Sequence, residues 1–99
     1  MSRYRLSLAA QADLDEIWLY IATQASMETA DTLIDSITNR FPVIASMPRI
    51  GRSAEIDVKD VRVLPVESYL VYYRSTPKGV QILRVIHGMR DQRSALNAE

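Results

Sequence analysis

The chain has 99 residues, so we expect one domain with a single hydrophobic core, spanning residues 1–99. Hydrophobic residues make up 47% of the sequence and charged residues 24%, which favours a compact folded chain over a disordered one. Cysteine is absent, and "MSRYRLSLAA" has too short an apolar stretch for a signal peptide. We therefore expect a cytoplasmic protein, and no run is long enough to predict a membrane span.

The charges balance overall but not along the chain. There are 12 Lys and Arg residues and 12 Asp and Glu residues, whereas a general nucleic-acid binder is usually basic. Residues 1–48 hold three arginines and six acidic residues, while residues 49–99 hold nine basic and six acidic residues. The first half is therefore acidic and the second half basic.

The first half predicts one short strand and one helix. "YRLSL" alternates Tyr4, Leu6 and Leu8 with polar residues, as in a strand with one buried face. Apolar residues then recur at spacings of three and four, which predicts an amphipathic helix. These residues are Ala10, Leu14, Ile17, Trp18, Ile21 and Ala25. We expect Trp18 to belong to the core, as a single tryptophan on such a stripe usually does.

A second helix is predicted to begin directly after the first. Ser26 is a suitable N-cap, and the two helices are joined so closely that they should form a hairpin. Pro42 lacks the amide hydrogen that a continuous helix needs, so we expect a kink or a restart there. Pro48 and Gly51, in "MPRIGR", end the helical part.

Residues 61–88 predict a β-sheet. The runs "VRVLPV", "YLVYYRS" and "VQILRVIHG" are rich in β-branched and aromatic residues and are separated by very short breaks. Such connections make neighbouring strands antiparallel, and the N-terminal strand can add at one edge. The predicted fold class is α+β with the order β-α-α-β-β-β, in which the helical hairpin covers one face of the sheet.

Four segments carry a family resemblance, and they extend over nearly the whole chain. These are "YRLSLAAQADLDEIWLYIA", "MPRIGR", "VRVLPVESYLVYYR" and "RVIHGMRD", in this order. Together they resemble the ParE-type toxins of the RelE/ParE superfamily of bacterial toxin-antitoxin systems. The resemblance implies a cytoplasmic growth inhibitor that a ParD-like antitoxin neutralises. For ParE members it implies inhibition of DNA gyrase, whereas RelE members cut messenger RNA on the ribosome.

The RNA-cutting alternative requires a base, an acid and cations for the phosphate. His87 could act as the acid because imidazole titrates near physiological pH. A base is hard to find, since beyond His87 there is no Tyr or Lys and the only carboxylates are Asp91 and Glu99. The candidate residues of a nuclease are His87, Arg62, Arg74 and Arg90.

Strand alternation also separates two of the candidates. Arg84 and Ile86 should share one face, and His87 should lie on the other face with Leu83 and Val85. A lone histidine after an apolar run is more often structural than catalytic, typically bonding a carbonyl.

We therefore interpret the chain as a toxin that acts by binding rather than by catalysis, with RNA cleavage as the alternative. A member whose toxicity is lost, or whose target lies elsewhere, is a third possibility. No metal site, cofactor, membrane contact or sequence-specific DNA binding is expected. The residues predicted to contact the target or the antitoxin are Arg62, Arg74, Arg84, His87, Arg90 and Asp91.

Overall fold

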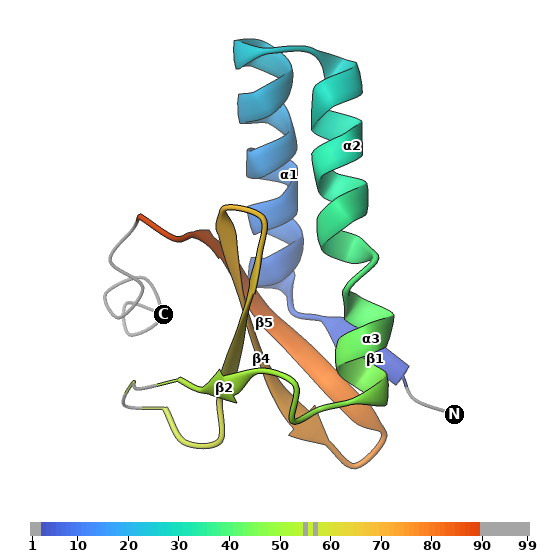
Figure 1. The fold of residues 1–99 in the computed structure, drawn as a ribbon, viewed down its shortest axis with the longest axis vertical. Coiled ribbons are helices and arrows are strands. Elements are labelled where there is room, and N and C mark those ends of the chain that lie inside the picture. Colours follow the sequence, from blue (N-terminus) through green and yellow to red (C-terminus); the bar gives the residue numbers. More distant parts are fainter. Residues whose placement is uncertain (1–2, 55, 57, 90–99) are drawn as a thin grey trace.

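The computed structural model describes residues 3–54, 56 and 58–89, and it has a layer of helices on one face of a five-stranded sheet (Figure 1). The helices are α1 (Leu8–Gln24), α2 (Met27–Thr38) and α3 (Phe41–Ser46). The strands are β1 (Arg3–Leu6), β2 (Arg52–Ser53), β3 (Arg62–Val66), β4 (Tyr69–Thr76) and β5 (Gly79–His87). The predicted α+β class, with a helical hairpin on the sheet, is confirmed.

The sheet has the order β1-β5-β4-β3-β2. β3, β4 and β5 form the predicted antiparallel meander, and β1 joins the free edge of β5 as a parallel strand. β2 pairs with the start of β3 and was not predicted. Two residues are too few to give a period-two signal, so β2 is defined by its pairing alone.

Ser7 ends the first strand and begins α1. Its Oγ accepts a hydrogen bond from the amide of Ala10 at 2.9 Å and donates one to the carbonyl of Leu83 at 2.7 Å. Leu8 is therefore the first helical residue and is 83% exposed, so the prediction that it extends the buried face of the strand was wrong. The N-cap outweighs the alternation of apolar residues here.

The second helix is interrupted as predicted. The Oγ of Ser26 caps α2 by accepting from the amide of Thr29 at 3.0 Å. α2 ends at Thr38, and α3 restarts at Phe41 with Pro42 in its first turn, where a missing amide hydrogen is tolerated. In Figure 1 the α1-α2 hairpin extends well beyond the edge of the sheet, so its far end is not packed on the strands.

Tyr72 and Tyr73 separate the buried residues into two clusters, because neighbouring strand residues point to opposite faces. Tyr73 belongs to the main core between the helices and the sheet. Tyr72 clusters on the helix-free face with Ala54, Val61, Val63 and Ile86. Residues just before β3 thus cover part of the second face.

Trp18 is half-buried rather than fully in the core. Its indole nitrogen donates to a carboxylate oxygen of Asp31 at 2.7 Å and so connects α1 with α2. Within the described ranges, no helix combines the length and the apolar character that crossing a membrane requires.

Candidate functional site

A β-bulge in β5 decides which side chains face the helices. Tyr72 pairs with Arg84, whereas Tyr73 pairs with Ile82, so Leu83 is an extra residue in β5. Leu83 packs in the cluster on the helix-free face, while Val85 belongs to the main core. The prediction that these two residues share a face was therefore wrong. Regular alternation cannot anticipate an inserted residue.

Arg84 follows the bulge directly and pairs with Asp13 of α1. The guanidinium binds the carboxylate in bidentate fashion, with Nε–Oδ2 at 2.8 Å and Nη2–Oδ1 at 3.0 Å. Asp13 is only 7% exposed, and it also accepts the amide hydrogen of Val85 at 2.9 Å. Arg84 was predicted to contact a partner, but its charge is used inside the domain.

Sequence reasoning missed Asp13, although a signal for it was present. Asp13 lies between Ala10 and Ile17 at helical spacing, so it occupies the buried stripe of α1. An acid at such a position requires an internal partner. The partner, 71 positions later, could not be located without the fold.

The start of α1 also replaces a strand at the edge of β5. β1 ends at Leu6, after which the amide of Ser7 donates to the carbonyl of Ile82 at 2.9 Å. The hydroxyl of Ser7 and the carboxylate of Asp13 then bind the next backbone groups along this edge, at Leu83 and Val85. Side chains of α1 therefore satisfy the polar groups that β1 leaves open.

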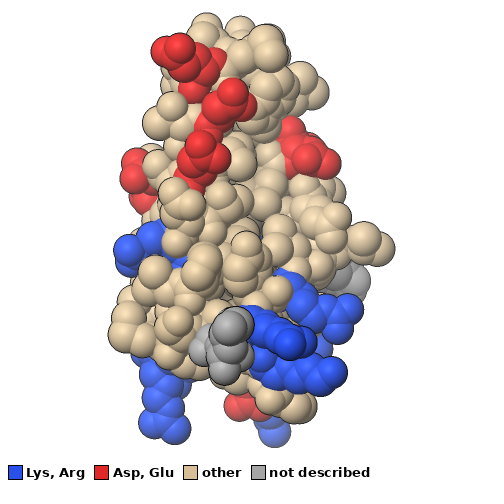
Figure 2. All heavy atoms as spheres, turned by 90° about the vertical axis from the view of Figure 1, so that its right-hand side faces the viewer, with Lys and Arg blue, Asp and Glu red and all other residues tan. Residues whose placement is uncertain are grey.

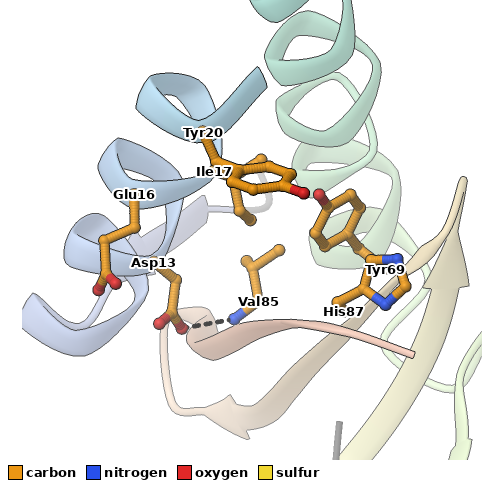
Figure 3. A pocket seen from close by; sticks show the side chains of 7 residues that line it. All are labelled: Asp13, Glu16, Ile17, Tyr20, Tyr69, Val85 and His87. Atoms are coloured by element: carbon orange, nitrogen blue, oxygen red, sulfur yellow. Dashed lines mark hydrogen bonds between the residues drawn. The ribbon is translucent and has the colours of Figure 1, made fainter. Parts of the chain in front are cut away.

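His87 lies in a pocket of about 460 Å³ between α1 and the sheet (Figure 3). The ring of His87 meets that of Tyr69 edge to face, with centroids 5.2 Å apart. Its Nδ1 accepts the amide hydrogen of Met89 at 3.1 Å, so the neutral ring carries its proton on Nε2. His87 thus accepts from a backbone amide, where we had expected it to bond a carbonyl. The lining residues are Asp13, Glu16, Ile17, Tyr20, Tyr69, Val85 and His87.

The chemistry of this pocket suits a protein side chain better than a phosphate. The phenol groups of Tyr20 and Tyr69 point toward each other across its opening (Figure 3). Burial raises the pKa of Tyr69 above 10.0, and the neighbouring Tyr20 raises it further, so this phenol is neutral at physiological pH. Among the described residues, the lining includes two carboxylates and no Lys or Arg, so these residues do not supply the cations that an RNA phosphate needs.

Arg62 and Arg74 lie toward the other end of the sheet. Arg62 pairs with Tyr73, whereas His87 pairs with Tyr69, four residues away along β4. At the usual rise of a strand, this separates their backbones by about 13 Å along the sheet. Arg62 shares the helix side with Tyr73, but Arg74 follows Tyr73 and points to the opposite face. The structure therefore does not bring Arg62, Arg74 and His87 together.

Arg62 helps to hold the "MPRIGR" segment on the sheet. Its Nη1 donates to the carbonyl of Gly51 at 2.8 Å. The hydroxyl of Tyr73 donates to the carbonyl of Pro48 and accepts from the amide of Gly51, both at 2.8 Å. A Cβ at Gly51 would lie 2.7 Å from that hydroxyl oxygen and 2.8 Å from the carbonyl of Val63, so glycine is needed here.

The predicted contact residues Arg90 and Asp91 lie outside the described residues. Figure 2 shows how the remaining charges are arranged on one side of the molecule. Asp and Glu gather over the helical part, whereas Lys and Arg gather over the part built by the sheet. The imbalance between the two halves of the sequence is therefore also a separation in space. In the described part of the chain, no group of three His, Asp or Glu side chains is placed to hold a metal ion.

Comparisons with known proteins agree on one family. The model of the ParE toxin of the type II toxin-antitoxin system parDE matches residues 4–92. A Mycobacterium tuberculosis protein named Toxin ParE1 is 34% identical over 91 residues, which cover 91% of this chain and 93% of the relative. Toxin ParE1 of Caulobacter vibrioides is 33% identical over 96 residues, covering 97% of this chain and 99% of that protein.

A solved structure has the same fold. A chain of the chromosomal ParDE TA system from P. aeruginosa matches with a TM-score of 0.77 and 25% sequence identity. The match covers 88% of this chain and 96% of that one. The full-length family match, the curated relatives and this structure establish that the chain belongs to the ParE toxin family of type II toxin-antitoxin systems.

Proposed function

We propose that this toxin arrests bacterial growth in the cytoplasm by binding DNA gyrase, and that a ParD-like antitoxin neutralises it. Membership of the ParE family supports the target. One structural observation carries the binding mode: His87 faces a pocket that contains carboxylates, about 13 Å along the sheet from the level of Arg62. This backbone separation does not favour His87 and Arg62 acting on the same phosphate, as acid catalysis of RNA cleavage would require.

The antitoxin has an apolar surface to cover on the helical hairpin. Leu19 and Tyr20 are each 62% exposed on α1, and Met27 is 65% exposed at the start of α2. Tyr20 also lines the pocket beside His87, so the apolar surface continues into a cavity that can receive an anchoring side chain. We expect the antitoxin to bury these apolar residues and to place acidic groups near the Lys and Arg residues over the part built by the sheet.

Two assays on the purified toxin test this proposal directly. We expect loss of gyrase supercoiling activity, and no cleavage of messenger RNA when ribosomes are supplied. Adding the cognate antitoxin should restore supercoiling. Cleavage of messenger RNA by the toxin, with supercoiling unaffected, would overturn the gyrase assignment. A protein inactive in both assays would instead be a member whose toxicity is lost or whose target lies elsewhere.

His87→Ala separates binding from catalysis. General acid catalysis typically contributes a factor of about a hundred or more, so a nuclease should lose that much activity. In a binder we expect growth inhibition to be largely retained, because His87 is one edge of a partly apolar pocket. Growth arrest after induction is the measurement, and the circular dichroism spectrum of the purified variant shows whether the fold is intact.

A further inference from the structure

Four cations form a strip across the helix-free face of the sheet. Strand pairing places Arg5 of β1 beside Gln81 of β5, and Gln81 beside Arg74 of β4. Arg3 lies two residues from Arg5 in β1 and therefore points to the same face. Lys78, in the turn between β4 and β5, lines a shallow groove with Arg5 and Gln81. We call Arg3, Arg5, Arg74 and Lys78 the basic strip.

The cations of the basic strip have no charged or hydrogen-bonding partner among the described residues. All four residues are exposed, and their side chains make no hydrogen bond or ion pair with the described residues. Arg62 and Arg84, in contrast, bind Gly51 and Asp13. Four like charges on one face repel one another, and an external anion would relieve this repulsion.

None of the acidic residues that the structure describes is assigned to the strip. Six of the described acidic side chains belong to α1 and α2, on the other side of the sheet. Of the remaining two, Glu67 lies in the turn between β3 and β4, and Asp60 lines a different groove with Arg49 and Arg62. The eight described acidic side chains therefore do not cancel the charge of the basic strip locally.

We propose that the basic strip binds the phosphate backbone of duplex DNA without reading its sequence. This inference rests on the proposed function in one respect, which is that the relevant DNA is the segment held by gyrase. Strands lie about 4.8 Å apart, so the backbones of Arg5 and Arg74, on either side of β5, lie roughly 10 Å apart on one face of the sheet. Such a surface reaches the backbone but inserts no helix or ribbon into a groove.

A phosphate backbone fits the strip better than an acidic protein does. Stable protein interfaces have an apolar or aromatic centre. Between the cations, this face presents Gln81 and Thr76, whose polar side chains suit phosphate oxygens. Tyr20 and Met27, two of the exposed large hydrophobic residues, lie on the helical hairpin instead.

The proposal predicts a measurable dependence on salt. If all four cations contact phosphates, the logarithm of the binding constant should fall with the logarithm of salt concentration with a slope of about −3.6. Replacing one contact should make the slope shallower by about one. Arg74→Gln therefore tests the strip, and Arg40→Gln is the matched control, because Arg40 is an exposed arginine just before α3.

The experiment is a titration of a fluorescently labelled short DNA duplex with toxin at several salt concentrations. We expect Arg74→Gln to reduce the salt slope by about one, Arg5→Gln with Arg74→Gln by about two, and Arg40→Gln to leave it unchanged. Equal slopes for all four proteins, or no binding of the duplex, would overturn the proposal. Binding of a poly-glutamate peptide but not of the duplex would also overturn it, in favour of an acidic protein partner.

A gyrase assay distinguishes failure of this inference from failure of the proposed function. If the wild type inhibits gyrase and the double variant does so equally well, with an unchanged salt slope, the strip has no role in DNA binding. If the wild type does not inhibit gyrase but binds the duplex through the strip, the target is wrong and the DNA site stands. We expect the double variant to need several-fold more protein to inhibit supercoiling.

Discussion

The two ends of the sheet hold their cations in different ways. At the end near His87, Arg84 is 12% exposed and is bound by a buried carboxylate on α1. At the β4-β5 hairpin, Arg74 is exposed and has no partner among the described side chains. Both residues are arginines in strands of the same hairpin. The comparison shows that the position of the counter-charge, rather than the residue type, separates a structural cation from one available for binding.

Replacing Arg84 or Arg74 should give the largest difference in the free energy of unfolding. Arg84→Met keeps most of the apolar stem but leaves Asp13 as an unpaired buried charge, so we expect the free energy of unfolding to fall by about 3–5 kcal/mol. Arg74→Met is the matched control and should change it by less than about 0.5 kcal/mol. Urea denaturation of both variants measures the difference. Similar losses for the two would show that Arg74 also has a structural role.

The second contrast concerns Tyr73, whose hydroxyl holds the "MPRIGR" segment on the sheet. Tyr73→Phe leaves the amide of Gly51 and the carbonyl of Pro48 without their partner, and we expect a loss of about 1–3 kcal/mol in the free energy of unfolding. Tyr4→Phe removes a phenol with no hydrogen bond to the described residues and serves as the control. If both variants are equally stable, the loop is held by Arg62 rather than by Tyr73.

Much of the fold could be predicted because local signals agreed with the tertiary structure. The helical spacing, the cap at Ser26, the break at Pro42 and the alternating strands all survive in the structure. The failures are local as well. Leu8 follows a stronger N-cap, and β2 is too short to leave a pattern. Periodicity encodes neither a capping hydrogen bond nor a two-residue strand pairing.

The candidate site was harder to predict because it depends on one inserted residue. The bulge at Leu83 changes which side chains share a face, and Asp13 and Arg84 are 71 positions apart in the chain. The basic strip is invisible in the sequence for a similar reason. Arg5 and Arg74 are far apart in the chain and become neighbours of Gln81 only because β1 adds to the edge of β5.

A third contrast compares the two helix caps. Ser26→Ala removes the cap of an exposed helix terminus and an exposed hydrogen bond to the hydroxyl of Thr29, and should cost about 1 kcal/mol. Ser7→Ala removes the same kind of cap and also the bond to the carbonyl of Leu83 at the edge of β5, so we expect about 2 kcal/mol. Thermal or urea unfolding measures both. Equal losses in the two variants would mean that water bonds to the carbonyl of Leu83 in place of the Ser7 hydroxyl.

The smallest expected effect on the free energy of unfolding comes from the buried tyrosine phenols, and it vanishes near neutral pH. Burial raises the pKa of Tyr69 and Tyr73 above the ordinary value of 10.0. Above pH 10 the unfolded chain loses phenolic protons that the folded chain still holds, so the free energy of unfolding should fall as pH rises. Tyr69→Phe should make this fall less steep, as measured by denaturation at neutral and alkaline pH.

The neighbours of these phenols should act with opposite sign at the two ends. Tyr20 raises the pKa of Tyr69, whereas burial raises the pKa of Tyr73 against the opposing effects of the Gly51 hydrogen bond and of Arg62. Tyr20→Phe should therefore lower the pKa of Tyr69, and Arg62→Met should raise that of Tyr73. Titration of the phenolate absorbance measures both shifts. Shifts of the same sign would contradict the distinction between a pocket whose described lining has no cation and a loop supported by an arginine. A cation stabilises a phenolate, and a second phenol does not.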